Sequence, residues 1–126
     1  MSRKIVPMVF AVLAAGLAAF PPQAPAQAGT DKQLYVVTYV DVYPNFAADA
    51  TKLLEQFAAD SRKDGAVRFE VMRDVARTNH MAIVEVWPNR KIYEAHLTAA
   101  HAKNFREKLQ TMLGSPFDER LYNVFP

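Results

Sequence analysis

Hydrophobic and polar positions along this chain follow two periods, the alternation of strands and the three-to-four-residue spacing of helices. Residues 33–42 (QLYVVTYVDV) are β-branched or aromatic at most positions, which is typical of a strand covered on both faces. From Phe46 to Ala58, apolar residues recur at helical spacing. Asn45 is the expected N-cap of this helix, and Gly65 is its expected end.

Five further elements are predicted after Gly65, in the order strand, strand, short helix, helix and strand: residues 67–74, 81–87, 92–96, 100–113 and 119–125. The first of these strands alternates apolar and polar residues, as a half-exposed strand does, whereas the second is strongly apolar. Thr98 marks an expected change of direction between the two helices and is a candidate N-cap for the second.

The predicted order of elements is β-α-β-β-α-β, the split βαβ arrangement of a ferredoxin-like α+β domain. Helices cover only one face of the antiparallel sheet in that fold. The strands at residues 33–42 and 81–87 are nonetheless apolar on both faces, so the uncovered face needs a partner. A second copy of the sheet is the simplest cover, and the sequence therefore predicts a homodimer with a barrel-like core, a dimeric α+β barrel.

The N-terminal segment has the layout of a secretory signal peptide. A short basic start precedes an apolar run at residues 5–20, and residues 26–28 (AQA) fit an A-x-A cleavage site. The run is shorter than the roughly 20 residues of a membrane-spanning helix. We expect residues 1–28 to be removed on export and residues 29–126 to form one domain. That domain is expected in the periplasm or outside the cell, without a stable membrane anchor.

Charge and composition narrow the range of functions. The chain has 15 Lys and Arg residues against 13 Asp and Glu, but Arg3 and Lys4 belong to the export segment, so the remaining charges balance. No basic run interleaved with aromatic residues is present, so nucleic-acid binding is not expected. The chain has no cysteine, which excludes disulfides, a thiolate nucleophile and cysteine-ligated metal clusters.

Two of the three histidines, His96 and His101, lie five residues apart in the stretch EAHLTAAHAKNF. On one continuous helix they would be about 140° apart around the axis, and helical metal-binding pairs are spaced three or four apart, so no metal site is expected. A helix break near Thr98 would place them on different helices, one facing a pocket and the other at its rim. The alternative is that they cap or pack the helix junction.

The segment VEVWPNRKIYEAHLTAAHAKNF resembles the signature of the antibiotic biosynthesis monooxygenase family, in particular its quinol monooxygenase branch. The matching residues are a Glu-x-Trp strand end, an Ala-His pair on a short helix, a second His five residues later and then an aromatic: Glu85, Trp87, Ala95, His96, His101 and Phe105. The stretch DGAVRFEVMRD is similar to the family's Gly-x-x-x-(aromatic)-Glu strand. Ala99-Ala100 replaces the Ser/Thr-Pro of many members, and Asp64 stands where Pro is usual, a change interpreted as harmless.

The resemblance implies a dimeric α+β barrel with a pocket between helices and sheet. Some members oxygenate quinols or phenols with O₂ and without metal or flavin, whereas others have no known activity. We accordingly expect an exported, cofactor-independent monooxygenase that oxidises a small quinol or polyphenol with O₂ as co-substrate. His96 is the candidate general base, and His101 is expected to assist or orient it. The alternative is a non-catalytic dimeric module that binds a small aromatic or lipophilic ligand.

Five aromatic residues are candidates for the substrate pocket: Trp87, Tyr93, Phe105, Tyr39 and Phe69. For Trp87 the alternative is a core position at the end of a strand.

The sequence also predicts the environments of two other polar residues. Glu85 is expected to pair with an arginine such as Arg68 or Arg73. His80 is expected in a solvated turn.

Haem chemistry is not expected. Haem-degrading relatives use an Asn on the first strand, a Trp on the short helix and an axial His on the last helix. This chain has Thr38, His96 and Arg106 near those places.

Overall fold

Four antiparallel strands form one sheet in the order β2-β3-β1-β4. In the computed structural model, which describes residues 32–126, they are β1 (Leu34–Asp41), β2 (Arg68–Arg73), β3 (His80–Trp87) and β4 (Asp118–Tyr122). The predicted signal peptide and its cleavage site lie outside the described residues. Across residues 32–126, no helix has the length and apolarity needed to cross a membrane.

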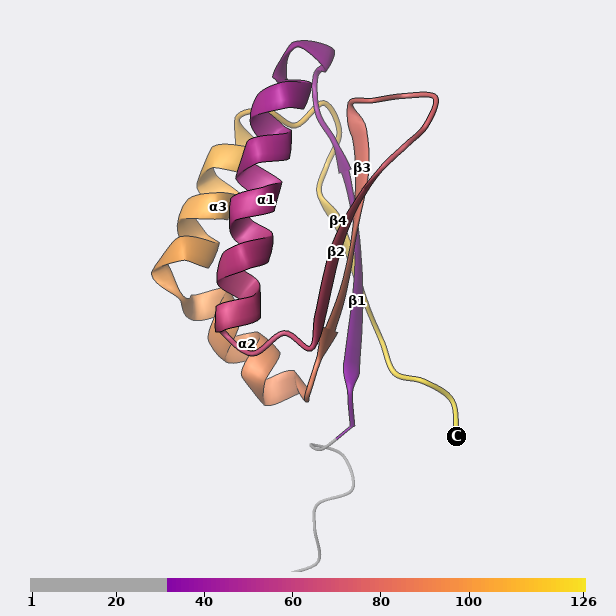
Figure 1. Cartoon of the computed structure of the whole chain (residues 1–126), viewed down its shortest axis with the longest axis vertical. Helices are drawn as coiled ribbons and strands as arrows, with labels where there is room; N and C mark the ends of the chain where they lie inside the picture. The colour runs from indigo at the N-terminus through magenta and orange to yellow at the C-terminus, as the bar shows by residue number, and fades with distance from the viewer. Residues whose placement is uncertain (1–31) are drawn as a thin grey trace, which may run out of the picture.

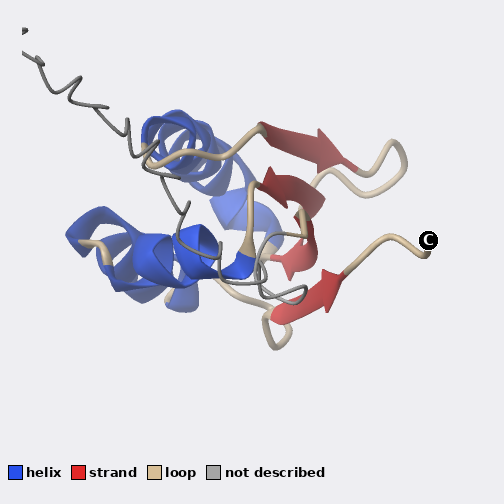
Figure 2. Ribbon diagram, turned by 90° about the horizontal axis from the view of Figure 1, so that it is seen from below, coloured by secondary structure: helices blue, strands red, loops and turns tan. Residues whose placement is uncertain are grey.

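Three α-helices pack on one face of this sheet (Figures 1 and 2). They are α1 (Ala47–Lys63), which follows the short 3₁₀ helix η1 (Pro44–Phe46), α2 (Arg90–Thr98) and α3 (Ala100–Gln110). Helices α1 and α3 lie side by side over the sheet, and α2 joins β3 to α3 at one end. The predicted ferredoxin-like α+β fold is confirmed.

The ends of several elements differ from the sequence-based expectation. Asn45 lies inside η1, and Phe46 occupies the N-cap position of α1 without a side-chain cap. The N-cap of α2 is Asn89, whose Oδ1 accepts a 2.9 Å hydrogen bond from the Ile92 N–H. The last strand ends at Tyr122 rather than at residue 125. Gly65 ends α1 as predicted, with a φ of 110° that favours glycine.

Ala99 divides the two C-terminal helices. Its backbone is extended (φ −64°, ψ 146°), so α2 stops at Thr98 and α3 starts in a new direction at Ala100. Thr98 was predicted to be the N-cap of the helix that follows it, α3. Its hydroxyl instead donates a hydrogen bond to the carbonyl of Ala95 within α2. The expected change of direction is present, and it follows from Ala99 alone.

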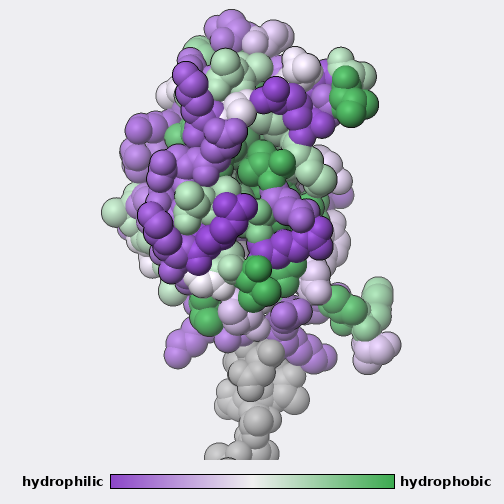
Figure 3. Space-filling model, viewed as in Figure 1, coloured by the Kyte–Doolittle hydropathy of each residue, from purple (hydrophilic) through white to green (hydrophobic). Residues whose placement is uncertain are grey.

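The main hydrophobic core lies between the helices and the face of the sheet that they cover. Twelve buried residues from α1, α3 and the three longer strands form one cluster, with Leu54, Ile83 and Leu109 almost fully inaccessible. A second cluster of Leu34, Val36, Trp87 and Tyr93 lies under α2. Hydrophilic side chains gather over the helices in the edge-on view of Figure 3.

The opposite face of the sheet carries no helix within residues 32–126. Its central apolar side chains are flanked by charged ones, Arg68 and Glu70 on β2 and Asp118 and Arg120 on β4. Because side chains alternate along a strand, the positions that point away from the helices are set by the strand register. The apolar residues at these positions, which we call the outer face, are Tyr35, Val37, Tyr39, Met72, Ala82, Val84, Val86 and Tyr122. Tyr39, Met72 and Tyr122 are each about half exposed, at 50%, 46% and 47%.

Candidate functional site

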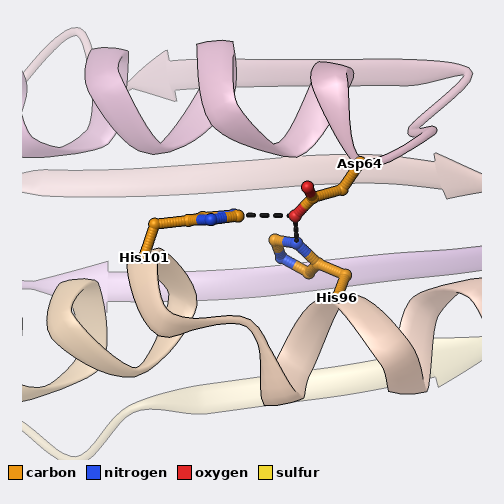
Figure 4. Close-up of side chains that lie close together, drawn as sticks. All are labelled: Asp64, His96 and His101. Carbon is orange, nitrogen blue, oxygen red and sulfur yellow. Dashed lines mark hydrogen bonds and ion pairs between the residues drawn. The ribbon is translucent and has the colours of Figure 1, made fainter.

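Three side chains from three different elements meet beside the helix junction (Figure 4). Asp64 is the C-cap of α1, His96 belongs to α2, and His101 lies in the first turn of α3. The break at Ala99 turns the two helices so that both histidines point to the same carboxylate. The placement of the two histidines on different helices agrees with the sequence analysis. The replacement at Asp64, interpreted there as harmless, instead supplies the carboxylate that both histidines contact.

One oxygen of Asp64 contacts both histidines. His96 Nδ1 lies 2.7 Å from Asp64 Oδ2 in hydrogen-bond geometry. His101 Nε2 lies 2.7 Å from the same oxygen, but the two atoms are not aligned as a hydrogen bond, and this nitrogen has no hydrogen-bond partner within residues 32–126. The His96 side chain is only 1% exposed, whereas those of His101 and Asp64 are 31% and 27% exposed. The site therefore opens to solvent on the side of Asp64 and His101.

The contact with Asp64 selects one tautomer of His96. A carboxylate accepts hydrogen bonds, so Nδ1 carries the proton and Nε2 keeps its lone pair. Nε2 is buried and has no hydrogen-bond partner in the described part of the chain. Burial lowers the pKa of His96, while the hydrogen bond and the charge of Asp64 act in the opposite direction. His96 is thus a neutral imidazole with a free acceptor nitrogen.

Aromatic rings surround His96 inside the fold. The Trp87 ring centroid lies 4.6 Å from that of His96, and the Phe57 centroid lies 5.3 Å away. Phe57 in turn stacks on Phe105 at 3.8 Å and meets Phe69 edge-on at 5.5 Å. The sequence analysis missed Phe57, because its place on the apolar stripe of α1 marks it only as a core residue.

Four of the five predicted pocket residues belong to this aromatic group on the helical side of the sheet. Trp87 lies beside His96, Tyr93 contacts Trp87, and Phe69 and Phe105 contact Phe57. The prediction for Tyr39 is wrong. Tyr39 pairs with Ala82 and Asp118 on the outer face, so the sheet separates it from the histidines. Strand alternation is the reason, since Thr38 and Val40 take the helix-facing positions.

A partly buried group of polar side chains lies behind Trp87. The indole Nε1–H donates a 2.7 Å hydrogen bond to Glu85 Oε2. Tyr93 donates to Glu119 Oε1 at 2.7 Å, and Arg106 donates to Glu119 Oε2 at 2.9 Å. Burial raises the pKa of Glu85 to about 7, with a further increase from the negative charge of Glu119, although the Trp87 N–H favours the carboxylate.

The expected arginine partners of Glu85 are absent from this group, and that prediction is wrong. Arg68 lies opposite Val86 on the other face of the sheet and pairs with Glu70 at 2.7 Å. Arg73 lies opposite Met81, at the far end of β2, and donates to the hydroxyl of Thr51. Register and strand face, which the residue types do not encode, decide both outcomes.

The third histidine, His80, contacts a carboxylate rather than lying in solvent as expected. His80 begins β3, and its Nδ1 lies 2.7 Å from Asp41 Oδ1. Ser115 donates to the other oxygen of Asp41 at 3.0 Å. His80 is therefore a contact partner of Asp41 at a strand end and not a solvated turn residue, because β1 and β3 bring the two residues opposite each other.

The main surface hollows in the described part of the chain are spread over the molecule, and none of them is bordered by His96. A hollow of about 410 Å³ on the side of the outer face is bordered by Tyr39, Met72 and His80. A second hollow, also of about 410 Å³, lies between α1 and β2 and is bordered by Arg62 and Phe69. Another of about 210 Å³ is bordered by Arg106 and Phe117. The rings of Trp87 and Phe57 take up the space beside the imidazole itself.

Solved structures of several proteins share this fold. A conserved protein of unknown function from Bacteroides thetaiotaomicron is 18% identical, with a TM-score of 0.70 over 75% of this chain and 99% of that one. An antibiotic biosynthesis monooxygenase is 16% identical, with a TM-score of 0.70 over 74% and 99%. A protein from Pseudomonas aeruginosa is 17% identical, with a TM-score of 0.69 over 75% and 96%. Similarity at this level of identity concerns the fold.

Sequence comparison identifies the family. A search of curated proteins gave no match. The antibiotic biosynthesis monooxygenase family, by contrast, matches residues 33–108. That range includes Asp64, both site histidines and the aromatic residues Phe57, Phe69, Trp87, Tyr93 and Phe105. With this match over more than half of its length, the chain belongs to the antibiotic biosynthesis monooxygenase family.

Proposed function

We propose that this protein is an exported, cofactor-independent monooxygenase that oxidises a small quinol or polyphenol with O₂. The observation that carries the proposal is the environment of His96. Its Nδ1 is hydrogen-bonded to Asp64, whereas its Nε2 lies among aromatic rings and has no hydrogen-bond partner within residues 32–126. Residues 1–28 are proposed to direct export, with Gly29 as the first residue of the mature protein. Quinol oxidation would place the chain in the quinol monooxygenase branch of its family.

In this proposal His96 is the general base. Its Nε2 takes the hydroxyl proton of the bound quinol, and the resulting anion is electron-rich enough to reduce O₂ by one electron. The semiquinone radical and superoxide then combine at a ring carbon. One oxygen atom stays on the substrate, and the other leaves as water, so O₂ is the only oxidant required.

Asp64 and His101 have supporting roles. Asp64 holds the Nδ1–H tautomer of His96 and stabilises the imidazolium that forms when Nε2 gains a proton. His101 contacts the same carboxylate oxygen from the half-exposed rim and orients it. The rings of Trp87 and Phe57 must shift to admit a planar substrate, which would then stack in their place.

Oxygen uptake tests this function. Purified protein in chelator-treated buffer would be given a panel of hydroquinones and naphthoquinols, with enzyme-free solutions measuring autoxidation. We expect uptake that saturates with substrate and exceeds autoxidation at every concentration. Uptake equal to autoxidation for every quinol would refute the enzyme assignment.

A non-catalytic module that binds an aromatic or lipophilic ligand is the second candidate. The aromatic rings beside His96 favour it, because they offer stacking surface for a planar ligand and binding requires no proton transfer. Quenching of Trp87 fluorescence by a naphthoquinol, without oxygen uptake above autoxidation, would select this candidate. Trp87 is the only tryptophan in the sequence, so the signal reports the site directly.

We also propose that the protein is a homodimer joined through the outer face. Val84→Lys would put a charge in the middle of that face, opposite Val37, and is expected to convert a dimer into a monomer. Ala95→Lys, on the exposed surface of α2, is the matched control and should leave the dimer intact. Light scattering provides the mass, and a wild-type mass of one chain would contradict the proposal.

A further inference from the structure

We propose that Asp64, His96 and His101 form a binding site for a divalent cation of the zinc type, and that an ion bound there prevents His96 from acting as a base. The first part needs no enzymatic activity. The second part rests on the function proposed above.

The ligand atoms are suitably grouped. One carboxylate oxygen and two imidazole nitrogens lie within 4.8 Å of one another. Zinc binds such nitrogen and oxygen ligands at about 2.0–2.2 Å, which separates tetrahedral ligands by roughly 3.3–3.5 Å. Asp64 Oδ2 now lies 2.7 Å from each nitrogen, so a retreat of under about 1 Å makes room for the ion.

The surroundings allow that movement. Asp64 is the last residue before the turn at Gly65, and its partly exposed side chain can change rotamer without moving buried groups. The three ligands come from three elements, so the fold holds them together without relying on spacing along one helix. The open side at Asp64 and His101 leaves a fourth position for water.

The geometry of His101 is the second observation in favour of a cation. Its Nε2 is buried and close to the carboxylate oxygen, yet it makes no aligned hydrogen bond in the described region. The neighbouring cation, Arg106, is already bound to Glu119 at 2.9 Å and does not neutralise Asp64. Two imidazoles and a carboxylate thus converge, and within residues 32–126 no Lys or Arg side chain pairs with Asp64.

Metal binding and proton abstraction use His96 in opposite ways. A metal ion on Nδ1 displaces the proton that Nδ1 donates to Asp64. The single proton of the neutral ring then resides on Nε2, which becomes a donor and no longer accepts a proton from substrate. Occupancy by zinc therefore inhibits the base.

The binding test uses metal alone. Chelator-treated protein would be titrated with Zn²⁺ by calorimetry and with Co²⁺ by visible absorption, which reports tetrahedral coordination. We expect one ion per chain, with affinity reduced about 100-fold or more by either Asp64→Asn or His101→Gln, since loss of even an outer-shell partner costs 10–100-fold. Circular dichroism would establish that each variant is folded.

His80→Gln is the matched control, because His80 has the same 2.7 Å contact with an aspartate but no second histidine. We expect its affinity to equal that of the wild type. Absence of binding, equal binding by Asp64→Asn and His101→Gln, or loss of binding in His80→Gln would each overturn the site.

Oxygen uptake in the presence of Zn²⁺ tests the second part. Inhibition is expected at the zinc concentration that fills the site, and unchanged turnover at full occupancy would overturn it. If no quinol supports turnover, the proposed function fails together with the inhibition that rests on it. The binding titration still decides the cation site.

Discussion

His96→Gln is expected to lower kcat/KM for quinol oxidation by about 10²–10⁴, the usual contribution of a positioned general base. Glutamine keeps a polar side chain that can contact Asp64 but provides no imidazole to take the substrate proton. The measurement is saturable oxygen uptake, corrected for autoxidation. His80→Gln removes a histidine outside the site and should leave kcat/KM unchanged. Activity of His96→Gln within about twofold of the wild type would remove His96 from the mechanism.

Asp64→Asn is also expected to lower kcat/KM, because it changes the tautomer of His96. The asparagine amide can donate to Nδ1, which would move the proton to Nε2 and remove the acceptor that substrate needs. The double variant with His96→Gln should be no slower than the slower single variant, because the two residues act as one unit. Asp60→Asn, one helical turn earlier in α1, is the matched control. Losses that multiply in the double variant would show that Asp64 acts independently of His96.

Glu85→Gln is expected to stabilise the protein above pH 7. The folded-state pKa of Glu85 is raised from about 4.5 to about 7, so between these values the folded state holds a proton that the unfolded state releases. The stability that protonated Glu85 provides is therefore fully present below pH 4.5 and is lost as the pH rises to 7. The loss is about 3 kcal/mol. Glutamine stays neutral and can still accept the Trp87 N–H.

Urea unfolding at several pH values from 4.5 to 8 measures this effect. The free energy of unfolding of Glu85→Gln should exceed that of the wild type increasingly as the pH rises. Glu70→Gln is the matched control on the neighbouring strand, because Glu70 is exposed and Arg68 lowers its pKa. That variant should show no gain at high pH. A difference between Glu85→Gln and wild type that stays constant with pH would mean that Glu85 has an ordinary pKa.

The order of elements and most of their limits could be predicted from local pattern. A period of two or of three to four residues reflects backbone geometry, and Gly65 ends a helix because its φ of 110° suits glycine. The aromatic neighbourhood of His96 was predicted in part, since Trp87 lies beside its ring and three other aromatic residues singled out from the sequence lie one ring further away. These features depend on neighbours in sequence or on burial, and residue types encode both.

The tertiary structure decided which candidates meet. Strand β1 is apolar on both faces, so its pattern does not say which face meets the helices, and Tyr39 was placed on the wrong one. Asp64 lies 32 residues before His96, and it reaches the histidines only because α1 ends beside the break at Ala99. The sequence by itself determined the elements and the aromatic, histidine-containing interior. Only the packing of three helix ends made Asp64 the partner of both histidines, because contact between distant residues depends on how the elements are oriented in space.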